Sequence, residues 1–167
     1  AVSIYQEKRA YLRIECYNME KSKVKIYNAS KYPLPEYQSS GAAGVDLYAD
    51  IDEPIEISNQ NIYTIPTGIY LELPPGYEAQ IRARSGLAMK HGIALVNGIG
   101  TIDSDYRGEI KVILTNLKAF SHTIHPGDRI AQMVIKSYVT ADFVEVDSVE
   151  ALTETERSDG GFGHSGM

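Results

Sequence analysis

The sequence has a single cysteine, Cys16, and no tryptophan among its 167 residues. One cysteine cannot form an internal disulfide, and it cannot supply the thiolate cluster of a structural zinc site. No apolar run reaches the roughly 18 residues that a membrane-spanning helix needs. Residues 7–9 are charged (Glu-Lys-Arg) where a secretory signal would be apolar. We therefore expect an intracellular, cytoplasmic protein with no membrane partner, the nucleus being left open.

Positive charge is also scarce, with 16 Lys and Arg against 22 Asp and Glu, which gives a formal net charge of −6. A field of that sign repels polyanions and argues against nucleic acid as the partner. A small anion would need local cationic groups and the help of a divalent metal. The apolar share of 43% suffices for the core of one domain of this length.

The four histidines do not form a pattern typical of a metal site. His122 and His125 are three positions apart in a predicted strand and turn, whereas His91 and His164 have no carboxylate or cysteine at ligand spacing. We interpret all of them as surface residues. The sequence also lacks the Gly-x-x-x-x-Gly-Lys-Ser/Thr loop and the Gly-x-Ser-x-Gly elbow, which excludes P-loop and α/β-hydrolase enzymes.

What the sequence does contain is a series of short alternating runs bounded by Gly, Pro, Asn and Asp, at the spacing typical of β-sandwiches and barrels. In the clearest run, residues 77–84, apolar and polar side chains alternate, which directs Arg84 away from the core. Residues 69–73 alternate too, and the Pro-Pro-Gly sequence after them predicts a hairpin. We expect further strands at residues 24–27, 45–49, 62–65, 93–96, 110–115, 122–124 and 130–139.

One short helix is predicted at residues 86–90, with Ser85 capping its first turn and Gly92 ending it. Residues 1–18 have no clean period and precede Met19, so we interpret them as an extension or an artefact. An extra helix or strand packed on the core is the alternative. Residues 19–152 would form the core domain, and residues 153–167 a glycine-rich, flexible arm.

A compact polar segment follows the Asn-Gly pair at 97–98 and points to chemistry. The carboxylate of Asp103, just past a tight turn, could act as a general base toward water, and the ring of Tyr106 could stack on a substrate. Simpler interpretations stay open. The Asn-Gly pair is typical of an ordinary hairpin, and Asp105 with Arg107 is typical of a structural ion pair or of turn hydrogen bonds.

Two further segments could bind an anion. The sequence Arg84-Ser85-Gly86 at the beginning of a helix combines a guanidinium, a hydroxyl and free backbone N–H groups, although simple capping explains it as well. The glycine-rich end offers backbone donors and the face of Phe162, although such a stretch is more often a floppy tail. The sequence thus favours a β-rich enzyme that cleaves a nucleoside triphosphate.

Taken together and in this order, these segments resemble the trimeric dUTP pyrophosphatase (dUTPase) family. The resemblance spans residue 19 to the end of the chain. Any one of the motifs is weak, but their ordered occurrence is very specific. The motifs are AGVDLYA at 43–49, ARSGLA at 83–88, NGIGTIDSDYRG at 97–108, GDRIAQ at 127–132 and RSDGGFGHSG at 157–166.

The resemblance implies an all-β, jelly-roll-like β-barrel with one short helix, and a homotrimer with active sites between subunits. It implies hydrolysis of dUTP to dUMP and pyrophosphate, which limits uracil incorporation into DNA and supplies dUMP for thymidylate synthesis. Asp103 would activate water for in-line attack on the α-phosphorus. Tyr106 would stack on the deoxyribose and leave no room for a 2′-hydroxyl. The remaining implied contacts are Arg84, Ser85 and Gly86 to phosphate, Asn97, Gly98, Thr101, Ile102 and Lys111 to uracil, and Arg157, Phe162, Gly163, His164 and Ser165 from the arm.

The resemblance also implies Mg²⁺ carried in by the triphosphate, with Asp46 and Gln132 holding its waters. The arm would close over a neighbouring subunit's site. It departs from the commonest pattern at Ser158, where glycine is usual, and at residues 164–165, where Ser-Thr is frequent. Two rival functions are a dCTP deaminase of the same superfold and a noncatalytic nucleotide-binding barrel.

Overall fold

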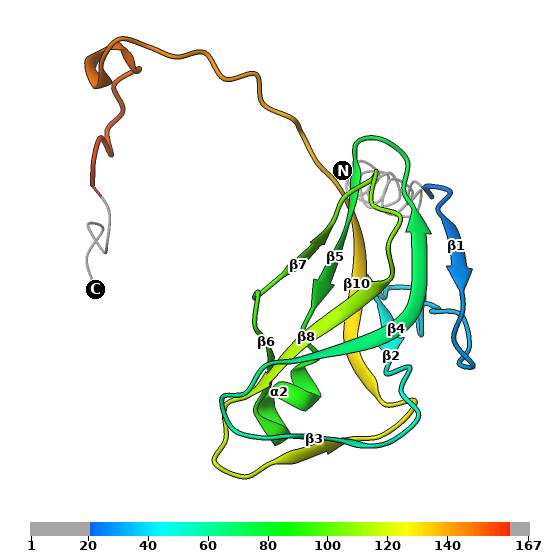
Figure 1. Ribbon diagram of the computed structural model, residues 1–167. Coiled ribbons are helices and arrows are strands. Elements are labelled where there is room, and N and C mark those ends of the chain that lie inside the picture. The colour runs from blue at the N-terminus through cyan, green and yellow to red at the C-terminus, as the bar shows by residue number, and fades with distance from the viewer. Residues whose placement is uncertain (1–20, 161–167) are drawn as a thin grey trace, which may run out of the picture.

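The computed structural model describes residues 21–160 and is built almost wholly of β-strands (Figure 1). The predicted extension at 1–18 and the arm residues Phe162, Gly163, His164 and Ser165 lie outside this range. The all-β, jelly-roll-like fold class is confirmed. In chain order the strands are β1 Lys25–Asn28, β2 Val45–Tyr48, β3 Ile55–Ile57, β4 Tyr63–Glu72, β5 Tyr77–Arg82, β6 Ile93–Leu95, β7 Gly100–Ile102, β8 Ile110–Asn116, β9 His122–Ile124 and β10 Arg129–Ser137, with the α-helix α2 at Ser85–His91 and the 3-10 helix η2 at Val149–Ala151.

The strands of the described range form two four-stranded sheets and a small two-stranded one. The first sheet has the order β1-β4-β8-β6, the second β2-β10-β5-β7, and the third pairs β3 with β9. In β8 the alternation predicted from the sequence is clear, because Ile110, Val112 and Leu114 are at most 1% exposed while Lys111 faces the other way. The buried apolar cluster draws on strands of both large sheets, so they pack face to face around one core.

The hairpin predicted around residues 74–76 is wrong. Strand β4 pairs with β1 and β8, whereas β5 pairs with β10 and β7, so the turn leads from one large sheet to the other. Pro74 and Pro75 have no backbone N–H with which to continue a ladder. The turn is closed by a 3.2 Å hydrogen bond from Tyr77 N to Pro74 O.

Helix α2 follows β5 directly and differs from the prediction at its beginning. The N-cap is Arg84, no side chain makes a cap hydrogen bond, and Ser85 is the first helical residue instead of the cap. The chain turns helical one residue earlier than expected, which leaves the Ser85 hydroxyl at the helix beginning uncommitted to capping. The predicted end is confirmed, because Gly92 has a left-handed φ of 70° and its N–H donates to Ala88 O at 3.0 Å.

The interpretation of the histidines as surface residues holds for the exposed His125 and needs correction for His91 and His122. The rings of the latter two stack with centroids 4.0 Å apart, and both side chains are half-buried. They join the end of α2 to β9. Within residues 21–160, no group of three or more His, Cys, Asp or Glu could hold a metal ion.

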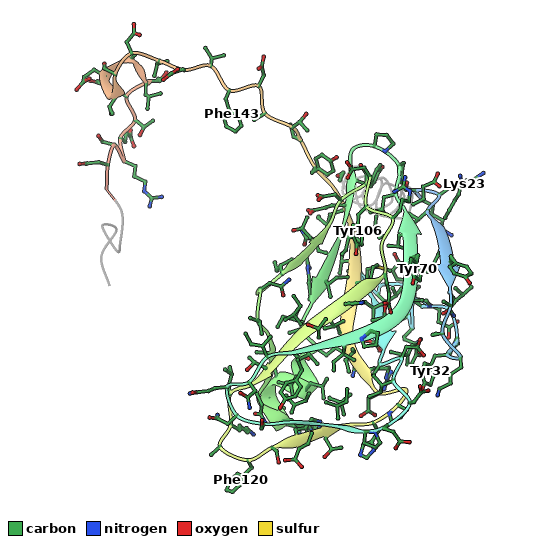
Figure 2. All side chains as sticks on the ribbon, viewed as in Figure 1. Lys23, Tyr32, Tyr70, Tyr106, Phe120 and Phe143 are labelled. Carbon is green, nitrogen blue, oxygen red and sulfur yellow. The ribbon has the colours of Figure 1, made fainter. Side chains whose placement is uncertain are left out.

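After β10 the chain leaves the β body as an extended segment (Figure 1). Its apolar side chains have no cover in the single chain, since Val139 is 96% exposed and Phe143 is 92% exposed. Figure 2 shows Phe143 on this segment, away from the body that carries Tyr106. No helix in the described part of the chain is long and apolar enough to cross a membrane.

Candidate active site

A cavity of about 300 Å³ lies beside β7 and β8, within the size range of small-ligand pockets. It gathers five candidate residues of the motif at 97–108 and the candidate Lys111 beyond it, but not Gly98; the five are Asn97, Thr101, Ile102, Asp103 and Tyr106. Its remaining lining residues are Thr64, Ile81, Leu95, Gly100, Glu109, Val112 and Ile113.

The turn at residues 97–100 forms one rim of the cavity. Gly98 takes a left-handed φ of 67°, its N–H donates to Leu95 O at 3.2 Å, and the Ile99 N–H donates to Asn97 O at 2.7 Å. The ordinary hairpin interpretation is wrong here, because β6 pairs with β8 whereas β7 pairs with β5. The turn therefore crosses between the two large sheets, and its two ends, Asn97 and Gly100, line the cavity.

The loop after β7 carries Asp103 and Tyr106 and is braced by its own residues. The Tyr106 N–H donates to Asp103 O at 3.2 Å. The Arg107 Nη1 donates to Ser104 O at 2.7 Å and to Tyr106 O at 2.9 Å. Of the two interpretations left open for Arg107, an ion pair or turn hydrogen bonds, the structure therefore contains the turn hydrogen bonds. They brace the loop from which Asp103 and Tyr106 both line the cavity.

Glu109 is a cavity residue that sequence reasoning missed. Its Oε1 accepts a 2.9 Å hydrogen bond from Gly68 N, and its Oε2 lies 3.6 Å from Lys111 Nζ. Gly68 belongs to the irregular stretch of β4 between Pro66 and Ile69, where the register with β8 shifts. Glu109 thus connects the end of the loop that carries Asp103 and Tyr106 to β4. Nothing in the sequence around Glu109 reveals a partner 41 residues away.

A second polar cluster lies on β2, on β10 and at Arg84, the N-cap of α2. Asp46 Oδ1 accepts a 2.8 Å hydrogen bond from Arg84 Nε, and Asp46 Oδ2 accepts bonds from Arg84 Nη2 at 3.3 Å and Arg129 Nη1 at 3.2 Å. The Asp46 side chain is only 18% exposed, so the guanidinium groups offset the cost of burying it. Sequence reasoning missed Arg129, although it stands in the GDRIAQ motif.

Gln132 adjoins this cluster, since it pairs in register with Asp46 on one side and Arg82 on the other. Its Nε2 donates to Ala83 O at 2.9 Å, which leaves its Oε1 as an acceptor. Asp46 and Gln132 therefore present hard oxygen donors of the kind that Mg²⁺ takes, but too few to enclose an ion. The pair fits a hydrated Mg²⁺ that arrives with its own ligands.

The two clusters do not meet in one chain. None of the residues Asp46, Arg84, Ser85, Gly86 and Gln132 lines the cavity around Asp103. Arg157, the one candidate site residue of the arm that lies within the described range, is on the extended segment, where its Nε donates to Gly160 O at 2.7 Å. The candidate base and the candidate phosphate ligands are thus on separate parts of the surface.

Comparison with known proteins decides which family has this arrangement. The family model for dUTPase matches residues 30–166. The chain belongs to the dUTPase family. Among its relatives, the deoxyuridine 5′-triphosphate nucleotidohydrolase of Finegoldia magna is 54% identical over 144 residues, covering 86% of this chain and 99% of that protein. The protein of the same description from Chlamydia felis is 51% identical, covering 80% and 90%.

Solved dUTPases share the fold. A glycine-to-serine mutant of the Staphylococcus bacteriophage 80alpha dUTPase with dUpNHpp superposes with a TM-score of 0.72 at 23% identity, covering 88% of this chain and 100% of that one. The dUTPase of phage phi11 of S. aureus, described with a structural Mg(II) ion, gives a TM-score of 0.68 at 21% identity, covering 77% and 99%. At these identities the likeness concerns the fold alone.

Proposed function

We propose that this dUTPase family member hydrolyses dUTP to dUMP and pyrophosphate. The observation that carries the proposal is that Asp103 and Tyr106 share one small cavity with Asn97 and Gly100, the two ends of the turn at residues 97–100. A carboxylate, a ring and a set of backbone donors and acceptors in one cavity suit a nucleotide whose base and sugar must be selected and whose phosphate must be attacked.

Asp103 is the general base of the proposal. Its carboxylate would accept a proton from a water molecule as that water attacks the α-phosphorus in line with the departing pyrophosphate. The Tyr106 N–H holds Asp103 O at 3.2 Å, so the backbone on either side of the base is fixed by the turn. The proton moves to the carboxylate, the new P–O bond belongs to dUMP, and pyrophosphate leaves.

The cavity would select the base and the sugar by different means. Asn97 and the backbone of Gly98, Thr101 and Ile102 would match the donor and acceptor edge of uracil, so cytosine, with a different edge, would leave polar groups unpaired. The backbone of Lys111 lies at the same wall. The ring of Tyr106 would stack on the deoxyribose and leave no room for a 2′-hydroxyl.

The triphosphate would bind at the second cluster. The backbone N–H groups at the beginning of α2, the Ser85 hydroxyl and the Arg84 guanidinium are its donors, with Gly86 allowing close approach. Asp46 and Gln132 would hold waters of a Mg²⁺ chelated by the substrate. Bound Mg²⁺ supplies charge neutralisation for the triphosphate.

A homotrimer is part of the proposal, and the separation of the two clusters supports an assembly of several copies. Since the Asp103 cavity and the Arg84 cluster do not meet in one chain, a complete site needs residues from different copies. The extended segment after β10 exposes Val139 and Phe143 and so has apolar surface for a neighbouring copy to cover. Residues 19–152 would form the core of each subunit, and residues 153–167 the arm, which brings Arg157, Phe162, Gly163, His164 and Ser165 to a neighbouring site.

In the cell, such an enzyme would act on the free nucleotide pool of the cytoplasm. Removing dUTP would limit uracil incorporation into DNA, and the dUMP formed would feed thymidylate synthesis. Residues 1–18 precede the core, and we assign them no part in the reaction.

Pyrophosphate release from dUTP, dTTP, dCTP and UTP, each with and without Mg²⁺, tests the activity. We expect Mg²⁺-dependent turnover of dUTP far above the other nucleotides, and equal turnover of all of them would contradict the proposal. Release of ammonia from dCTP would identify a deaminase. Nucleotide binding without any turnover would identify a noncatalytic binding protein.

Mixing inactive subunits tests the shared site. Asp103→Asn and Arg84→Ala chains are each expected to be inactive, and after joint unfolding and refolding the mixture is expected to regain activity, because some sites then combine an intact Asp103 with an intact Arg84. If both residues served the same chain's site, the mixture would remain inactive. Sizing of the unmixed protein gives the number of subunits.

A further inference from the structure

The aromatic ring of Tyr106 lies directly over Gly108. A Cβ atom placed on Gly108 would be 2.9 Å from Tyr106 Cε2, and closer still to Tyr106 Cζ and Oη. Real Cβ atoms do not approach other heavy atoms so closely. The Tyr106 ring can therefore occupy its position only because residue 108 has no Cβ atom.

Other contacts hold the ring against this glycine. The Tyr106 hydroxyl donates to Glu109 O at 3.0 Å, so the side chain folds back along the loop past Gly108, one of the two residues between them. Glu109 is itself anchored, because its carboxylate accepts the hydrogen bond from Gly68 N at 2.9 Å. The ring is thus held at its hydroxyl end by the Glu109 carbonyl, and the same end of the ring lies against a residue without a side chain.

A side chain at position 108 would act on the ring and not on the backbone. Gly108 is not among the glycines in the left-handed region, so alanine can adopt its backbone conformation without strain. The atoms that a methyl group would meet belong to the end of one side chain, and Tyr106 is 44% exposed, which gives the ring space to turn away. The cheapest response to the methyl group is a displaced ring in a folded protein.

We infer that Gly108 is a positioning residue that seats the Tyr106 ring in the cavity and thereby sets the preference for a 2′-deoxyribose over a ribose. The inference rests on the proposed function, in which Tyr106 stacks on the sugar. If the Tyr106 ring is displaced, the space that it fills becomes open to a 2′-hydroxyl. The displaced ring also stacks less well on the deoxyribose.

The test compares Gly108→Ala with the unaltered enzyme for dUTP and UTP. The ratio of kcat/KM for dUTP to that for UTP is expected to fall about 10- to 100-fold, the effect of misplacing a contact by roughly 1 Å. KM for dUTP should rise. Gly41→Ala is the matched control, because a Cβ at Gly41 meets no atom within 4 Å and its selectivity should stay unchanged.

Tyr106→Phe is the second variant, since it keeps the ring and removes the hydroxyl bond to Glu109 O. Its dUTP to UTP ratio should fall in the same direction and by less. A Gly108→Ala enzyme that slows equally on both nucleotides, or a Tyr106→Phe enzyme with an unchanged ratio, would overturn the inference. An unaltered enzyme that does not discriminate dUTP from UTP would instead overturn the proposed function, so the two failures are distinct.

Discussion

Arg84 and Asp46 form a two-point contact, with Nε 2.8 Å from Oδ1 and Nη2 3.3 Å from Oδ2. The guanidinium proposed to bind the triphosphate is therefore already held by a carboxylate. A bound triphosphate must compete with Asp46 for Arg84. When the triphosphate takes Arg84, the Asp46 carboxylate keeps Arg129, whose Nη1 lies 3.2 Å from Asp46 Oδ2, as its counter-charge.

Replacing Arg129 by Gln should weaken substrate binding. Without Arg129, Asp46 has only Arg84 to offset its charge and holds it more tightly against the triphosphate, so KM for dUTP should rise about 3- to 10-fold with a smaller change in kcat. Binding of dUpNHpp measured by calorimetry checks this. Arg82→Gln is the matched control, since Arg82 binds only Gln80 among the described residues. Equal effects of the two variants would exclude a special role for Arg129.

Replacing Asp103 by Asn should separate binding from catalysis. An amide cannot accept the proton of the attacking water, so turnover should fall about 10²- to 10⁴-fold while dUpNHpp still binds. Asp105→Asn is the control, because Asp105 lies in the same loop but outside the cavity lining. Its rate should remain close to that of the unaltered enzyme. If Asp103→Asn kept its rate, another group would have to be the base.

The strands and the central part of the site could be predicted from local sequence. Alternation of apolar residues along β8 and β5 follows from burial of one face, and residues 97–106 reach one cavity because they are nearly contiguous. Pairing partners could not be predicted in the same way. Whether the turn at 74–76 closes a hairpin depends on which sheet each strand joins, and that is decided by the packing of the whole core.

The sequence did not predict two residues of the site, Glu109 and Arg129, for a related reason. Glu109 matters through Gly68, and Arg129 matters through Asp46, 83 residues distant in the sequence. A charge in a motif does not reveal its partner when the partner comes from a different strand. The sequence indicated an anion site at Arg84 but gave no sign that a carboxylate already occupied its guanidinium.

Replacing Gly68 by Ala should destabilise the fold strongly. Gly68 has a φ of 65°, and a Cβ there would lie 2.7 Å from both Cβ and N of Ser30 and 2.9 Å from Asp50 Oδ2. The left-handed conformation costs roughly 1–2 kcal/mol and the overpacking about 1–3 kcal/mol more. Gly76→Ala, with a φ of 84° and no atom within 4 Å, should show only the first cost. Urea unfolding measures both, and equal free energies would mean that Ser30 simply moves aside.

Replacing His122 by Gln should reduce the loss of stability in mild acid. Burial lowers the pKa of His122, and the adjacent His91 lowers it further, against the opposing effect of Asp128. Since the folded-state pKa lies below the usual value of about 6.5, the unfolded chain binds the proton first as the pH falls. This contribution to stability is complete above about pH 6.5 and is lost as the pH falls toward the folded-state pKa. Removing the titrating ring removes that loss.

The measurement is the melting temperature of the two proteins between about pH 7.5 and pH 5, the window on either side of the ordinary histidine pKa. The His122→Gln protein is expected to start lower, because it lacks the ring stacked 4.0 Å from His91, and to fall less steeply. His125→Gln is the comparison, since His125 is exposed and has the smallest of the effects that lower the pKa of His122, so its variant should change the slope much less than His122→Gln does. A His122→Gln slope equal to that of the unaltered protein would show that carboxylates alone cause the acid sensitivity, and that the stacked pair at the end of α2 stays together when the pH falls.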